Sequence, residues 1–141
     1  MSTNTRFAVA IHILTLLAQR REELLTSEVI AGSVNTNPVV IRRILGALRK
    51  AALVNSHGGN CGGWWLLRDP EAITLANVYE AVEDDMLFPL HHRPPNPQCS
   101  VGRHIQHALT GHFDAASQAM KSELARTTVA DILQEVLTPV G

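Results

Sequence analysis

The clearest pattern of apolar and polar positions lies between residues 39 and 52. Four aliphatic residues recur there at i, i+3, i+4 and i+7, which places them on one face of a helix: Ile41, Ile44, Leu45 and Leu48. Asn37 is a suitable N-cap, and Pro38 suits the first helical position. The pattern therefore predicts a helix over residues 39–52 with an abrupt start.

The segments before and after this helix also have recognisable secondary-structure signals. Thr26-Ser27-Glu28 is typical of a helix start, and the breaker Asn35-Thr36-Asn37-Pro38 ends that helix. A glycine-rich stretch at 58–63 is followed by Trp64-Trp65-Leu66-Leu67, which predicts a β-hairpin. Helix, tight turn, helix and two-stranded flap is the order of a winged helix-turn-helix. We expect a mostly α fold with a two-stranded β wing.

Further helices are predicted outside this region. One covers about residues 4–19 with one apolar face, and Thr74 caps another over about 75–84. After a proline-rich connector, Asn96-Pro97 repeats the cap-plus-proline signature, so a long helix of about 45 Å should run to about residue 125. Thr128 and Asp131 form a capping-box-like start for a helix over 129–137. We expect residues 1–85 to form the winged helix-turn-helix region. Residues 86–141 supply the connector, the long helix and the terminal helix, within one compact domain.

The long helix has two faces that one small domain cannot bury. An apolar stripe recurs at spacings of three and four: Ile105, Leu109, Phe113, Ala116, Met120 and Leu124. A band of small residues lies beside it: Ala108, Gly111, Ala115 and Ala119. A symmetric partner helix is the simplest way to cover them, which predicts a homodimer. The expected interface residues are Ile105, Ala108, Leu109, His112, Ala115, Ala116 and Ala119.

Composition narrows the class of protein. The 141-residue chain has two cysteines, no run of 18 apolar residues and no signal-peptide layout at its start, so we expect reduced thiols, no membrane association and a cytoplasmic location. The net charge of −1 is split unevenly. Residues 1–68 hold eight Lys/Arg and three Glu, a net charge of +5, whereas residues 69–141 hold four Lys/Arg and ten carboxylates, a net charge of −6. A basic half joined to an acidic half suits a DNA-binding module attached to a part that does not touch DNA.

The helix over residues 39–52 is the expected DNA reader. Its polar side carries four cations and no carboxylate, namely Arg42, Arg43, Arg49 and Lys50, with Val39 and Gly46 among them. The free N–H groups at its start, after Asn37 and Pro38, form an anion site. An ordinary solvated face is the alternative, and the glycine-rich wing that follows favours double-stranded DNA.

At these residues the chain resembles the bacterial Rrf-two family of winged-helix transcription regulators. The resemblance is carried by Asn37-Pro38-Val39-Val40-Ile41-Arg42-Arg43-Ile44-Leu45 and Leu48-Arg49-Lys50-Ala51-Ala52-Leu53-Val54. It continues through the wing, residues 73–83 and Asn96-Pro97-Gln98-Cys99-Ser100-Val101-Gly102, nearly the whole chain. The family implies a DNA-binding fold in which Thr26 and Ser27, at a helix start, meet a phosphate. Capping is the other role open to these two hydroxyls.

The wing residues expected to reach DNA are His57, Asn60 and Trp64. The family usually has Arg before the glycines and a Gly-Tyr pair after them, so His57 and Trp64-Trp65 place the wing contacts differently here. A nucleotide-binding loop is excluded because the segment lacks the Gly-Lys-Ser/Thr ending and leads into a strand.

The sequence gives little support for a bound cofactor or an enzyme activity. The family's iron–sulfur sensors use three cysteines near the start of the long helix, and only Cys99 lies there, so no cluster is expected. Scattered histidines such as His104 and His107 give weak support for metal or haem, because no ligand motif joins them. No metal site and no enzyme activity are predicted. Cys99, expected in the first helical turn beside His92 and Arg93, is either a redox or electrophile sensor or a buried packing residue.

The sequence therefore predicts a homodimeric, sequence-specific transcription regulator, a repressor, on a palindromic operator. Two alternatives stay open: a thiol-based sensor acting through Cys99, and a protein-interaction module without DNA activity.

Overall fold

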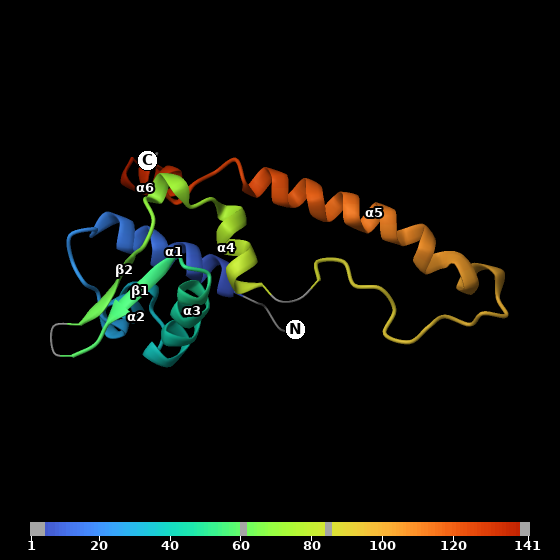
Figure 1. The fold of residues 1–141 in the computed structure, drawn as a ribbon, viewed down its shortest axis with the longest axis horizontal. Helices are drawn as coiled ribbons and strands as arrows, with labels where there is room; N and C mark the ends of the chain where they lie inside the picture. The colour runs from blue at the N-terminus through green and yellow to red at the C-terminus, as the bar shows by residue number, and fades with distance from the viewer. Residues whose placement is uncertain (1–4, 60–61, 84–85, 139–141) are drawn as a thin grey trace.

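The computed structural model describes residues 5–59, 62–83 and 86–138. Figure 1 shows a helical body with a two-stranded wing at one end and a long helix projecting from the other. The elements in chain order are α1 (Arg6–Gln19), α2 (Ser27–Val34), α3 (Pro38–Lys50), β1 (Val54–His57), β2 (Gly63–Leu66), the 3-10 turn η1 (Pro70–Ala72), α4 (Leu75–Val82), α5 (Ser100–Leu124) and α6 (Val129–Leu137). The expected mostly α winged helix-turn-helix is confirmed. No helix among the described residues is long and apolar enough to cross a membrane.

Helix α1 is the centre of the core. It contacts α2, α3, α4, α6 and β2, so it is buried on more than the single face its spacing predicts. Ile13 and Leu14 are fully buried, and Leu16 is nearly so. Elements pack around α1 from several sides, and the wing is therefore attached to the same core as the helix-turn-helix.

The helix-turn-helix forms through its caps. The Thr26 hydroxyl accepts a hydrogen bond from the Val29 N–H at 3.2 Å, and Asn37 Oδ1 accepts from the Val39 and Val40 N–H groups at 2.9 and 3.1 Å. Both N-caps and Pro38 at the start of α3 are as predicted. The apolar stripe of α3 is buried, from 0 to 4 % exposed.

Helix α3 ends two residues earlier than expected, at Lys50, because the chain turns there. The Leu53 N–H donates to the Leu48 carbonyl at 3.0 Å and the Ala52 N–H to the Arg49 carbonyl at 2.9 Å, the hydrogen bonds of a Schellman motif. Ala52 has φ +61°, a left-handed conformation that favours glycine. This turn directs the chain from α3 straight into β1.

Strands β1 and β2 pair antiparallel, with Ser56 opposite Trp64 and His57 opposite Gly63. Gly63 is required by a close approach: a Cβ there would lie 2.9 Å from the backbone of Leu24 and Leu25. At the next residue, the Trp64 N–H donates to the Leu25 carbonyl at 2.8 Å and the Leu25 N–H donates back at 3.2 Å. The first residues of β2 are therefore fixed to the loop between α1 and α2.

The terminal helix α6 folds back onto the body. Its capping box at Thr128 and that of α4 at Thr74 are both formed, and the two threonines face each other in an isolated β-bridge. Val129 is fully buried and its N–H donates to the Ile73 carbonyl at 2.8 Å. Packing therefore joins α6 to α1 and η1.

Helix α5 begins later than predicted. Asn96-Pro97 does not start it: Asn96 Oδ1 accepts from the Gln98 N–H at 2.9 Å, and the Asn96 carbonyl accepts from the Cys99 N–H at 3.2 Å. Asn followed by Pro suits the first two positions of such a turn as well as it suits a cap. Cys99 is itself the N-cap and Ser100 the first helical residue. The 25-residue helix is about 37 Å long, against the expected 45 Å.

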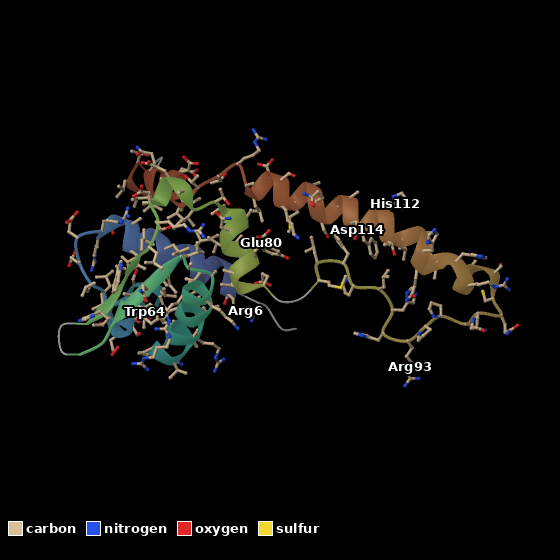
Figure 2. All side chains as sticks on the ribbon, in the orientation of Figure 1. Arg6, Trp64, Glu80, Arg93, His112 and Asp114 are labelled. Carbon is tan, nitrogen blue, oxygen red and sulfur yellow. The ribbon has the colours of Figure 1, made fainter. Side chains whose placement is uncertain are left out.

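One side of α5 faces its own chain and the other does not. The connector runs back along the helix (Figure 1), and the Phe88 and Phe113 rings lie 5.4 Å apart. Ala108, Ala115 and Ala119, on the opposite side, are exposed, and His112 projects away from the connector (Figure 2). None of the residues of α5 is buried.

Candidate DNA-binding surface

The outward face of α3 carries two cations that have no partner among the described residues. Val39, Arg43, Gly46 and Lys50 stand at i, i+4, i+7 and i+11, opposite the buried stripe. Val39 is 57 % exposed, and a Cβ at Gly46 would meet nothing within 4 Å. Arg43 and Lys50 form no ion pair or side-chain hydrogen bond with any described residue. Their charges are available to a ligand without breaking an existing interaction.

Arg42, by contrast, is already paired. Its Nη2 lies 3.4 Å from both carboxylate oxygens of Glu28, in the first turn of α2. Both side chains are more than half exposed, so the pair contributes little to stability and can open at small cost. Glu28 nevertheless offsets the charge of Arg42 on the surface that would approach DNA.

The starts of α2 and α3 differ in how far their polar side chains are exposed to a phosphate. Asn37 and Thr26 are exposed, but their side chains are engaged as caps of α3 and α2. Ser27 is 7 % exposed, so it presents almost no surface to a phosphate. Of the two hydroxyls expected at this start, only that of Thr26 lies at the surface.

Arg49 faces the wing. Its Nη1 donates a hydrogen bond to Ser56 Oγ at 2.9 Å, and its guanidinium lies 5.4 Å from the centre of the Trp64 ring. Figure 2 shows Trp64 in the wing, beside α3. Arg49 therefore joins the last turn of the expected reading helix to both wing strands.

The three wing residues predicted to reach DNA are not presented together. Side chains alternate along a strand, so His57 lies on the face opposite Ser56 and Trp64. There it lines a hollow with Trp65 and the 21–24 loop. Asn60 lies outside the described residues. One wing face thus turns to α3, and the other carries His57.

A groove of about 620 Å³ separates the base of α3 from α4. Arg43, Gly46 and Lys50 line one wall, and Glu80 lines the other. Figure 2 places Glu80 on α4, and Arg6 closes the groove at the start of α1. The cations of α3 border a surface that becomes acidic towards α4, so positive charge is concentrated on the α3 side.

Glu28 and Ser56 were missed from sequence because their partners are distant in the chain. Arg42 follows Glu28 by 14 residues and belongs to another helix, so no spacing rule on one helix connects them. Ser56 could have been found from the hairpin register, which pairs it with Trp64 on one face.

Comparison with known proteins agrees with this geometry. A model of the Rrf2 (Rrf-two) family, described as iron-dependent transcriptional regulators, matches residues 3–135. The chain belongs to the Rrf2 family. It is 45 % identical over 134 residues to YwnA of Bacillus subtilis (strain 168), described as an HTH-type transcriptional regulator, covering 94 % of this chain and 98 % of YwnA. The Rrf2 chain is therefore a DNA-binding transcription regulator in a family that is not one of enzymes.

Solved structures share the fold. A chain described as a DNA-binding protein is 42 % identical, with a TM-score of 0.75 and coverage of 91 % of this chain and 98 % of its own length. IscR of T. potens, 20 % identical, has a TM-score of 0.71 over 96 % of this chain and 88 % of its own. At that identity the likeness to IscR concerns the fold alone.

The family description names iron, but the residues here do not fit a three-cysteine cluster. The sequence holds two cysteines, Cys61, which lies outside the described residues, and Cys99 at the start of α5, and clusters require several thiolates together. Among the described residues, no group of three or more His, Cys, Asp and Glu is arranged to hold a metal ion. His104 is engaged locally, its Nδ1 lying 3.0 Å from the Ser100 carbonyl oxygen.

Cys99 is exposed, not buried, so packing does not explain it. The backbone N–H groups of Gly102, and then of Val101, lower the pKa of the Cys99 thiol. His92 and Arg93 do not contribute to this lowering, and Arg93 points away from α5 (Figure 2). Among the described residues, it is the helix start that lowers the pKa of this thiol.

Proposed function

We propose that this Rrf2 regulator acts as a homodimer that represses transcription from a palindromic operator in the cytoplasm. The observation that carries the proposal is α5, whose 25 residues include none that is buried. The uncovered side of α5 holds the expected interface residues Ala108, His112, Ala115 and Ala119. Small residues at this spacing allow two helices to approach closely, and a second α5 supplies a matching stripe.

A twofold dimer would explain how a protein with one short DNA-binding helix per chain achieves sequence specificity. One α3 has about three and a half turns and would contact few base pairs, whereas a pair doubles the contacts. In such a dimer the two α3 helices would enter successive major grooves about 34–36 Å apart. The proposed DNA contacts on each copy are Arg43 and Lys50 first, then Arg42, with Val39, Thr26, Asn37 and Pro38 at the helix starts and the wing alongside.

Selection of binding sites from random duplex DNA tests this directly. We expect enriched sequences with two inverted half-sites one helical turn, or a multiple of it, apart. Footprinting on the DNA upstream of the protein's own gene should then protect a matching site, and transcription from that promoter should fall when the protein is added. Enrichment of single half-sites only would contradict the dimer, and increased transcription would contradict repression.

A second candidate, thiol-based sensing, is favoured by Cys99 as an exposed N-cap with a lowered pKa. Attack of the thiolate on hydrogen peroxide would give a sulfenic acid and hydroxide. The group would sit at the start of the helix that sets the dimer geometry. Oxidant should then weaken DNA binding of the native protein but not of Cys99→Ser; equal responses would point to Cys61, and no response would exclude thiol sensing.

A further inference from the structure

Arg49 contacts both members of one cross-strand pair in the wing. Ser56 in β1 and Trp64 in β2 stand directly opposite each other in the ladder. Arg49 donates to the Ser56 hydroxyl at 2.9 Å and stacks over the Trp64 ring at 5.4 Å. A guanidinium is suited to this double role because it donates hydrogen bonds in its plane and stacks through its face.

The same pair is also connected to the body of the protein. The backbone of Trp64 is hydrogen-bonded in both directions to Leu25, so the start of β2 is held by the body. The Arg49 contacts hold the same part of the wing against the last turn of α3. A two-stranded hairpin is only marginally ordered by its own contacts, and these external contacts therefore govern how the wing stands relative to α3.

We infer that Arg49 is a positioning residue for operator binding: it fixes the wing relative to α3 rather than contacting a phosphate. The inference rests on the proposed joint use of α3 and the wing on DNA. It separates Arg49 from Arg43 and Lys50, whose side chains have no partner among the described residues. It also gives Trp64 a protein-facing role in place of the predicted DNA contact.

The first experiment needs no DNA. Amide hydrogen exchange is compared in the native protein, Arg49→Lys and Trp64→Leu, with Arg126→Lys, after the end of α5, as the matched control. We expect faster exchange in residues 54–57 and 63–66 of the first two variants, unchanged exchange in α1, and no change in the control. Lysine keeps the charge but cannot stack and donate in the same fork geometry, so native-like exchange in Arg49→Lys would overturn the inference.

The second experiment measures affinity for the selected operator and for random duplex across a range of salt concentrations. Arg49→Lys and Trp64→Leu should each reduce operator affinity about tenfold, the size of one cation–π contact with a hydrogen bond. The double variant should bind little more weakly than either, because the two residues act through one contact. The salt dependence of Arg49→Lys should equal that of the native protein.

Two results would overturn the inference here. Full operator affinity in Arg49→Lys, together with a shallower salt slope in Arg49→Ala, would make Arg49 a phosphate contact. Altered exchange with unchanged affinity would mean that the wing is held by Arg49 but does not serve DNA binding. In that case the proposed contribution of the wing to DNA binding would be wrong. The proposed DNA binding by α3 is tested separately, by Arg43→Ala/Lys50→Ala.

Discussion

Replacing Glu28 by Gln should strengthen DNA binding while weakening the fold. Glu28 lies 3.4 Å from Arg42, with the two side chains 62 % and 53 % exposed. Glutamine keeps the size of the side chain and removes the charge. Arg42 would then be free to turn to a phosphate, and a carboxylate that repels the DNA backbone would be gone.

The size of the change in affinity follows from the distance between Glu28 and Arg42 and from the exposure of the two side chains. Two unit charges 3.4 Å apart in water attract by about 1.2 kcal/mol, whereas exposed pairs measured in proteins contribute about 0.2–1 kcal/mol. Affinity for duplex DNA should therefore rise by between about 1.4-fold and fivefold. The free energy of unfolding should fall by up to about 1 kcal/mol, because Glu28 also stands at the positive end of α2.

The assay is a fluorescence-anisotropy titration of native protein and variant at low and moderate salt, with thermal denaturation alongside. Glu71→Gln, in η1, is the matched control, since it removes the same charge from an exposed carboxylate outside the helix-turn-helix. The gain should shrink as salt increases. Equal gains in Glu28→Gln and Glu71→Gln would refute the reasoning, because net charge alone would then explain both.

Three further predictions concern other parts of the chain. Ala52→Gly should stabilise the protein by about 0.5–1 kcal/mol in chemical denaturation, because Ala52 has φ +61° and glycine is not penalised there; a decrease in stability would mean that the turn is unstrained. Ala119→Glu should abolish the dimer in sedimentation whereas Thr110→Glu, on the opposite face of α5, should not, and the reverse pattern would move the interface. In a Cys61→Ser background, the alkylation rate of Cys99 should rise at lower pH in the native protein than in urea, because backbone N–H groups lower the pKa of the thiol only when folded. The contribution of this thiolate to the stability of the folded protein is accordingly present at pH above the pKa of the unfolded state. It is lost as the pH falls through the pKa of the folded state. Coincident rate profiles would contradict the helix-start effect.

Local signals predicted the helix-turn-helix well. Asn37-Pro38 and the apolar spacing of α3 act within one helix, so they specify its start and its buried side without reference to the rest of the chain. The same cap-plus-proline signal failed at Asn96-Pro97, because an Asn-Pro pair satisfies a turn through the same side-chain oxygen. Burial around α1 was underestimated because it depends on α6 and the wing, which approach from distant parts of the sequence.

The sequence predicted which face of α3 carries the cations, but not which of these cations are available to DNA. Sequence spacing grouped Arg42, Arg43, Arg49 and Lys50 on one side of a helix, and all four are exposed. Which of them are available depends on Glu28 and on Ser56 with Trp64, whose approach is set by tertiary packing. Helical periodicity contains no information on those neighbours.

Whether the outward face of α3 meets DNA is decided by the salt dependence of binding in Arg43→Ala/Lys50→Ala. Arg93→Ala/Arg126→Ala removes the same charge from the connector and the end of α5 and serves as the control. We expect the slope of log K against log salt to fall by about 0.9 for each phosphate interaction that the first variant removes, and to be unchanged in the control. A native slope and native affinity in Arg43→Ala/Lys50→Ala would contradict this expectation.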